Sequence, residues 1–197
     1  RLTSLIYFAC NNNAITTLPV GFGKLDQLTE IHFNSTKLDS LPYDIAYLNR
    51  LKLLEIQNNS AAKFIFPNSI GDLSNLNELT LFNTKLDTLP NTFSNFKRLK
   101  TLTVVMCSLD SIPKPISGIS SLEHLILDHN NIALLPNSIL KLKNLKTLSL
   151  KGNKLTHISD YICFMKNLEV LDISENYFKE YDIAVLKALL PKCRVLY

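Results

Sequence analysis

The chain has 197 residues, of which 46% are hydrophobic and 19% are charged, and its net charge is +4 at pH 7. This balance excludes a disordered or low-complexity chain, and no apolar run reaches the roughly 18–20 residues that span a bilayer. The lysines are spread along the sequence instead of forming a basic run, so we interpret them as a solvated face and do not expect nucleic-acid binding.

A repeat of about 23 residues runs along almost the whole chain. Six prolines mark it at steps of 23, 25, 23, 23 and 23 residues: Pro19, Pro42, Pro67, Pro90, Pro113 and Pro136. Eight copies begin at Leu5, Leu28, Leu51, Leu76, Leu99, Leu122, Leu145 and Leu168. The chain begins inside a repeat and without a methionine, so no targeting segment can be read from it.

Each copy begins with an LxxLxL segment, in which hydrophobic residues alternate with other residues. A period of two predicts a short strand with its leucines on one face and the intervening residues on the other. One such strand cannot bury its apolar face alone, whereas stacked strands share one continuous core. We therefore expect a parallel sheet that grows by one strand per repeat.

The full pattern, LxxLxLxxNxLxxLPxxIxxLxxL, resembles leucine-rich repeats of the 23-residue kind. It is similar to the arrays of Ras-suppressor- and Scribble-type scaffolds and of bacterial leucine-rich-repeat proteins. The resemblance implies an α/β solenoid, a curved right-handed superhelix with a parallel sheet on its concave side. Short helical or 3₁₀ turns are expected on the convex side, for example over residues 68–73 and 137–142. About eight repeats would occupy residues 1–180, and residues 181–197 would form a capping helix and a short strand.

One column of the repeat lies at the turn after the strand, where backbone polar groups need partners. Its members are Asn13, Thr36, Asn59, Thr84, Cys107, Asn130, Asn153 and Asn176. In the family this column is an asparagine ladder that bonds to neighbouring backbones. We therefore expect these residues to be structural, with weaker rungs at the three positions that depart from asparagine.

The pattern is broken in three places. The first repeat shows no capping segment, so its core edge is expected to be exposed unless residues precede it. The third repeat has two extra residues within Ser60–Phe66, where we favour packing of Phe64 and Ile65 over a role in ligand contact. Near the other end, Asp182 is expected to cap a helix that Pro191 ends, and residues 194–197 are expected to form a last strand.

The residues expected to face outward on the strands or just past them, Asn58 among them, are the candidates for catalytic and metal sites. His124 and His129 lie five residues apart, roughly 16 Å along a strand, which is too far to share a metal ion. His32 and Glu55 are expected to be neighbours on adjacent strands and to form an ion pair. Since no catalytic triad, glycine-rich phosphate loop or CxxC pair is present, we expect neither an enzyme nor a metal or other cofactor. The four cysteines are expected to be reduced or buried, and pairing of Cys163 with Cys193 is left open.

An apolar cluster is expected at the centre of the outward face of the sheet. Phe82, Val105, Met106 and Ile126 point outward on three consecutive repeats, with His129, Asp128 and Glu78 around them. Exposed apolar residues with a polar rim are typical of an interaction hot spot. The alternative is that they are ordinary scattered surface hydrophobes, and their position on adjacent strands favours a binding role.

These features favour a protein–protein interaction module that binds a macromolecular partner on its concave face. The alternative is an extracellular or cell-surface protein that binds carbohydrate or a host ligand, which would need exposed aromatic rings. A protein partner and a monomeric state are expected. The composition favours a bacterial source, and the compartment stays open between the cell surface, secretion and the cytoplasm.

Overall fold

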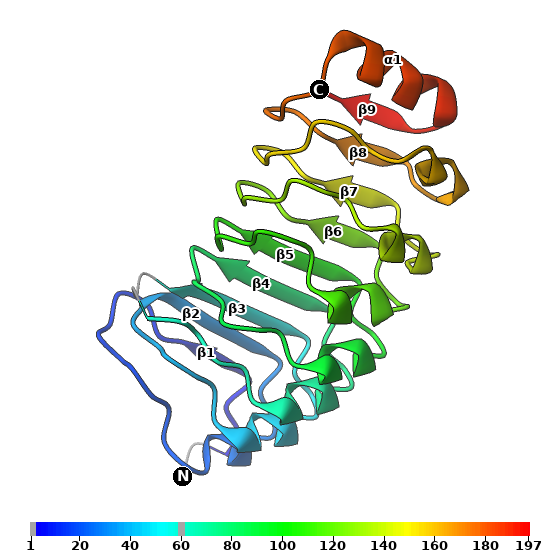
Figure 1. Ribbon diagram of the computed structural model, residues 1–197. Helices are drawn as coiled ribbons and strands as arrows, with labels where there is room; N and C mark the ends of the chain where they lie inside the picture. The colour runs from blue at the N-terminus through cyan, green and yellow to red at the C-terminus, as the bar shows by residue number, and fades with distance from the viewer. Residues whose placement is uncertain (1–2, 59–61) are drawn as a thin grey trace.

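The computed structural model describes residues 3–58 and 62–197. Within them, nine parallel strands form one sheet in which each strand pairs with the next along the chain (Figure 1). The strands are β1 (Tyr7–Ala9), β2 (Glu30–Thr36), β3 (Leu53–Asn58), β4 (Glu78–Phe82), β5 (Thr101–Val105), β6 (His124–Ile126), β7 (Thr147–Ser149), β8 (Val170–Asp172) and β9 (Arg194–Leu196). The sheet stays open, so the predicted α/β leucine-rich-repeat solenoid is confirmed.

Short 3₁₀ helices stack on the side of the molecule opposite the sheet (Figure 1). They are η1 (Phe22–Lys24), η2 (Tyr43–Tyr47), η3 (Asn68–Asp72), η4 (Asn91–Asn95), η5 (Lys114–Gly118), η6 (Asn137–Lys141) and η7 (Asp160–Phe164). From η2 to η6 the repeat proline is the residue before the helix, and its carbonyl accepts the first 3₁₀ hydrogen bond, as from Ile45 N–H to Pro42 O at 3.1 Å. In the part of the chain that is described, no helix is long and apolar enough to cross a membrane.

The leucines of the strands form the continuous core that the period of two predicts. Leu54, Leu79, Leu102, Leu125 and Leu148 are fully buried, and the strand register places each directly beside the next. Each buried leucine stabilises the fold by about 1.5–3 kcal/mol. Close stacking also extends to the 3₁₀ helices, where a Cβ on Gly71 would clash with the Thr92 carbonyl of the next repeat.

The asparagine ladder is present at the turns after the strands of the later repeats. The Asn153 Oδ1 accepts from Ile132 N–H at 3.0 Å, and its Nδ2 donates to Leu127 O at 2.9 Å. Asn130 and Asn176 bond in the same way. The rungs that depart from asparagine keep fewer bonds, because one hydroxyl or thiol replaces an amide. Asn59 lies outside the described residues.

The third repeat differs from the expected register. The pairing between β2 and β3 shifts near its end, and Asn58, which the repeat pattern places outward, is buried and donates to Leu38 O at 2.5 Å. Of the two hydrophobic residues of the insertion, Phe64 is fully buried and packs against Phe66 at 4.9 Å between ring centroids. Ile65 is 56% exposed, so the expected packing is right for Phe64 and wrong for Ile65. Residues 59–61 of this segment are not described.

The C-terminal end is covered by α1 (Glu180–Leu189) and β9. Asp182 lies within the first turn of α1, not at its cap position as the sequence indicates, and its carboxylate accepts from Lys179 N–H at 3.2 Å. All four cysteines are free thiols, so Cys163 and Cys193 are not paired. At the other end, Leu5 and Phe8 are only half-buried.

Candidate partner-binding surface on the sheet

The side chains that point away from the core form the outer sheet face, and the strand register arranges them in columns. Phe82 at the end of β4 pairs with Val105 at the end of β5, so the two side chains are neighbours in one column. Ile126 of β6 belongs to the adjacent column, where it pairs with Thr103 on one side and Ser149 on the other. The structure therefore brings these three predicted residues onto consecutive strands. All three are half-buried, so they are less exposed than the sequence suggests.

Met106 is the exposed member of the cluster. Met106 directly follows β5 and is 49% exposed. Its backbone N–H donates to Asp128 O at 3.1 Å. Its φ of 56° lies in the left-handed region, which costs a residue with a Cβ roughly 1–2 kcal/mol and suits asparagine or glycine better. An apolar side chain is thus held in solvent on a strained backbone position.

His129 occupies the same left-handed position one repeat further along, with φ 53°. Its N–H donates to Lys151 O at 2.8 Å. The imidazole packs over Gly152 of the next repeat so closely that a Cβ on Gly152 would clash with Nδ1. Because Gly152 itself has φ 65°, the glycine meets both the backbone and the space requirement at this point.

Asp128 lies between Met106 and the β7 strand and is held by hydrogen bonds. Its Oδ1 accepts from the Ser149 hydroxyl at 2.5 Å and from Lys151 N–H at 3.1 Å. Burial raises the pKa of the Asp128 carboxyl, although these two hydrogen bonds act in the opposite direction. Asp128 therefore fixes the polar border of the cluster rather than projecting freely toward a partner.

Glu78, the last predicted site residue, is not brought into the cluster. It begins β4, four residues before Phe82, which corresponds to roughly 13 Å along the strand. It is exposed and borders Thr101 of β5 at the opposite end of the outer sheet face.

The histidines on the outer sheet face have structural partners. His32 Nδ1 lies 2.6 Å from Glu55 Oε2, which confirms the predicted cross-strand pair, and Glu30 adds a second carboxylate at 3.9 Å that was not expected. His124 Nδ1 lies 3.1 Å from the Thr147 hydroxyl. Among residues 3–58 and 62–197, no group of three or more His, Cys, Asp or Glu side chains is placed to hold a metal ion.

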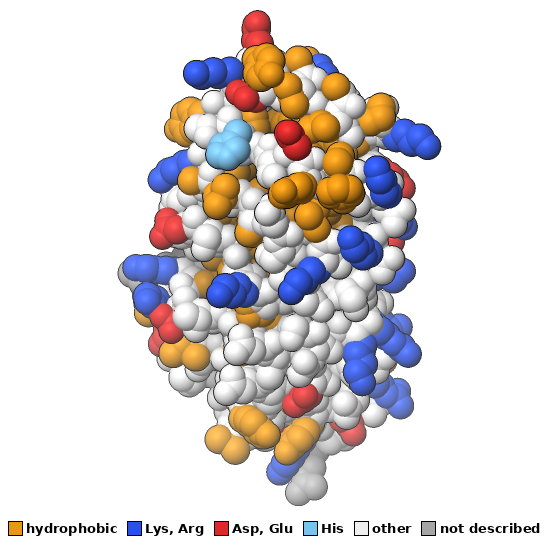
Figure 2. Space-filling model, turned by 45° about the vertical axis from the view of Figure 1, so that its right-hand side comes forward, with side chains coloured by type: hydrophobic (Ala, Val, Ile, Leu, Met, Phe, Trp, Pro, Cys, Tyr) orange, Lys and Arg blue, Asp and Glu red, His pale blue; other side chains and the backbone are white. Residues whose placement is uncertain are grey.

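Two surface features were not singled out from the sequence. Aromatic rings are exposed on the 3₁₀ side, including Tyr43, Tyr161 and Phe164, the last two of which stack with centroids 6.2 Å apart. Lysine and arginine side chains also gather along one edge of the molecule, at the right of Figure 2. The basic edge consists of residues about 23 positions or more apart that the solenoid stacks. The aromatic rings belong to single turns on the 3₁₀ side.

Comparison with known proteins supports the repeat architecture that the sheet and its ladders show. A family described as leucine-rich repeat region matches residues 1–112 and 70–194. A solved structure of a leucine-rich-repeat protein from Leptospira interrogans is 27% identical, with a TM-score of 0.66. That match covers 100% of this chain and 61% of the Leptospira chain, so the present chain spans less than two thirds of its length. No curated protein sequence matches significantly.

Proposed function

Because the chain belongs to the leucine-rich-repeat family, whose fold is generally a protein–protein interaction module, we propose that it binds a protein partner through the centre of the outer sheet face. This face corresponds to the concave side of the solenoid that the repeat pattern predicts. The proposed contact surface consists of Phe82, Val105, Met106 and Ile126, bordered by Asp128 and His129. Its role is that of a non-enzymatic binding scaffold, and Glu78 would make at most a peripheral contact.

The observation that carries the proposal is the exposed Met106 beside two half-buried apolar residues on neighbouring strands. A thioether side chain is flexible and polarizable and fits irregular partner surfaces. The surrounding backbone is fixed by the strand ladder, so binding would order little of this protein. Neither the strained backbone of Met106 nor its exposure stabilises the fold.

Carbohydrate binding on the same face has less support. It would need exposed aromatic rings for stacking, and Phe82 is half-buried while Tyr7, which is 52% exposed, lies on β1, three strands from β4. A protein partner therefore remains the proposed ligand of this face.

The test is affinity capture from extracts of the source organism with the wild type and the double variant Phe82→Glu/Met106→Glu. Two carboxylates in the apolar centre are expected to weaken partner binding at least tenfold without affecting the core, because neither side chain is fully buried. A milder variant, Met106→Asn, removes the apolar side chain and suits the left-handed backbone, so it is expected to weaken binding while the fold is slightly stabilised.

The matched control is Asn11→Glu/Asn12→Glu, which adds two carboxylates at the equivalent positions after β1. A protein that the wild type and the control retain and the double variant loses would identify the partner and locate its contact. Retention of the same protein with unchanged affinity by the double variant would contradict the proposal.

A further inference from the structure

The four residues before each strand line one edge of the sheet, which we call the entry edge. From β3 to β8 these tetrapeptides read NRLK, SNLN, KRLK, SSLE, KNLK and KNLE, at residues 49–52, 74–77, 97–100, 120–123, 143–146 and 166–169. Their last residues are joined by a backbone ladder, in which Asn77 N–H donates to Lys52 O, Lys100 N–H to Asn77 O and Glu123 N–H to Lys100 O, at 2.8, 2.8 and 2.9 Å. The same ladder continues through Lys146 and Glu169. Residues that are 23 to 25 positions apart in sequence are therefore direct neighbours on this edge.

The charge of the entry edge alternates from one repeat to the next. The tetrapeptides before β3, β5 and β7 carry +2, +3 and +2, whereas those before β4, β6 and β8 carry 0, −1 and 0. Lys192 and Arg194 then add positive charge at β9. Parallel strands lie about 4.8 Å apart, so the basic clusters recur roughly every 10 Å. Figure 2 shows Lys and Arg side chains along this edge, at the right of the view.

The clusters are held in place by contacts between repeats. Glu123 accepts from Lys146 at 2.7 Å and from Lys100 at 3.0 Å, and these hydrogen bonds lower the pKa of its carboxyl to about 2. The Arg98 guanidinium donates to Asn75 Oδ1 at 2.8 Å. By contrast, Lys97 and Lys143 are exposed and form no ion pair with any described residue, which leaves them available to an anionic ligand.

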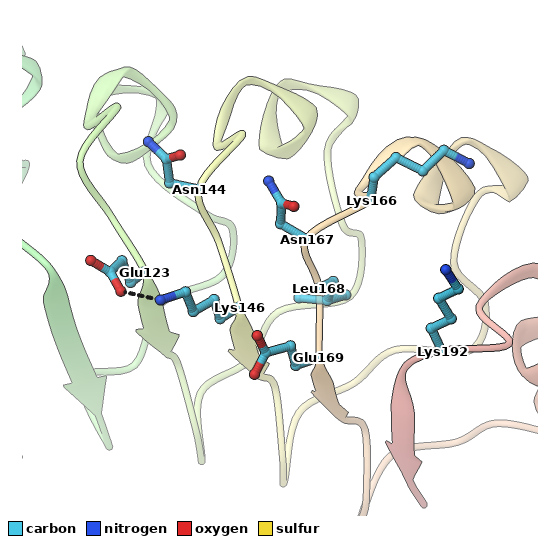
Figure 3. Close-up of a pocket in the computed structure, with 8 residues that line it drawn as sticks. All are labelled: Glu123, Asn144, Lys146, Lys166, Asn167, Leu168, Glu169 and Lys192. Carbon is cyan, nitrogen blue, oxygen red and sulfur yellow. Dashed lines mark hydrogen bonds and ion pairs between the residues drawn. The ribbon is translucent and has the colours of Figure 1, made fainter.

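At its C-terminal end the entry edge is hollowed. A depression of about 480 Å³ is lined by Lys146, Lys166 and Lys192 from three successive turns of the solenoid (Figure 3). Glu123 and Glu169 line it too, so the lysines exceed the carboxylates by one. Asn144 and Asn167 line it as well, and each donates its amide Nδ2 to a backbone carbonyl at 2.9 and 2.8 Å. The side-chain oxygens of the two asparagines remain as acceptors for hydroxyl groups.

We propose that the entry edge binds an extended acidic polysaccharide whose negative charges recur once per disaccharide. The spacing of the basic clusters, about 10 Å, is close to the length of a disaccharide in an extended chain. The tetrapeptides between the clusters, which carry a charge of 0 or −1, supply amides and hydroxyls that suit sugar hydroxyl groups. This surface is distinct from the outer sheet face, so the inference does not rest on the proposed protein-binding function.

Nucleic acid fits the same edge less well. Each strand of a duplex carries one phosphate per roughly 3.4 Å of helix axis, a period much shorter than the two repeats between basic clusters. The six tetrapeptides contain no aromatic residue on which bases could stack. Nucleic acid and anionic membranes are therefore the competing ligands that the test must distinguish from a polysaccharide.

The experiment measures binding of the 197-residue chain to hyaluronan oligosaccharides, which carry one carboxylate per disaccharide, at fixed ionic strength. Neutral dextran oligosaccharides, duplex DNA and phosphatidylserine vesicles are the comparison probes. The variant Lys97→Gln/Arg98→Gln/Lys100→Gln is expected to weaken hyaluronan binding about tenfold, as the loss of three exposed ion pairs predicts. The control Lys37→Gln/Lys85→Gln/Lys154→Gln removes the same charge from the opposite edge and is expected to bind within twofold of the wild type.

A second variant tests the spacing separately from the amount of charge. Asn77→Lys/Lys100→Gln moves one positive charge by one repeat and keeps the net charge, and we expect it to weaken hyaluronan binding severalfold. The proposal is overturned if the wild type does not bind hyaluronan, or if this variant binds it with wild-type affinity. It is also overturned if the opposite-edge control loses as much affinity as the entry-edge variant, or if the wild type binds DNA or vesicles as tightly as hyaluronan. Circular dichroism of each variant establishes that the fold is retained.

Discussion

Asn130 offers the sharpest test of how the side chains of the repeat provide hydrogen-bond partners for its buried backbone groups. Its buried side chain accepts from Cys107 N–H at 3.0 Å and from Leu109 N–H at 3.1 Å. Its Nδ2 donates to three backbone carbonyls, those of Val104, Leu127 and Asp128. Asn130→Ala leaves two N–H groups without their acceptor, and each orphaned donor costs about 1–3 kcal/mol, so we expect a loss of about 2–6 kcal/mol. That is a large part of the roughly 5–15 kcal/mol by which a folded protein is stable.

The assay for Asn130→Ala combines urea unfolding with amide hydrogen exchange. Exchange at Cys107 and Leu109 is expected to accelerate more than exchange in β8, because neighbouring repeats of a solenoid are only locally coupled. Asn13→Ala is the matched control, since Asn13 occupies the same column but is exposed, and its loss should stay within about 0.5 kcal/mol. If the two variants lose equal stability and their exchange is alike, the ladder does not satisfy the turn and the reasoning fails.

Three further predictions concern the core and two titrating groups. Leu125→Ala, at a fully buried position, is expected to cost about 2–5 kcal/mol in urea unfolding, and a negligible loss would mean that the strand register is wrong. The Glu123 carboxyl is expected to titrate near 2 by NMR and to return toward 4.5 in Lys146→Gln, so its ion pairs stabilise the fold above pH 4.5 and are lost as the pH falls toward 2. Burial raises the pKa of the Cys107 thiol to about 11, so at pH 8 a thiol reagent should label it at least tenfold more slowly than Cys10, and equal rates in the folded protein would contradict its burial.

The fold could be predicted almost completely because one short pattern is repeated. Alternating leucines, the turn asparagine and the proline each have a local physical reason, and eight copies in phase leave little room for another arrangement. The expectation fails where the repeat is irregular. Asn58 is buried instead of outward-facing because the β2–β3 register shifts beside the two-residue insertion. Phe64 and Ile65 take opposite directions because adjacent residues of an extended segment point to opposite faces, which composition cannot assign.

The candidate surfaces could be predicted only in part, for two different reasons. The period of two and the repeat length decide which outward-facing residues share a column, so the sequence alone places Phe82 and Val105 as neighbours. Their half-burial and the distance of Glu78 depend on where each strand begins and ends, which the repeat pattern does not specify. The basic edge was missed because its residues are scattered in the sequence. Lys52, Lys100 and Lys146 become one column only when the ladder stacks every repeat in register.

The two proposed surfaces use different positions of the repeat, and this explains why they can coexist in a small protein. The strand positions are constrained on one face by the core and are free on the other, so an apolar outward cluster costs little in packing. The tetrapeptide positions before each strand need only one buried leucine, so three of every four are free to carry charge. Met106 lies at a left-handed position that Ser35, His129 and Glu175 also occupy in their repeats, and this backbone costs roughly 1–2 kcal/mol that an asparagine would largely avoid. Among these residues only Met106 is apolar and lies next to the apolar centre of the outer sheet face, so the proposed contact with a partner would give a physical reason for a residue that the fold itself does not favour there.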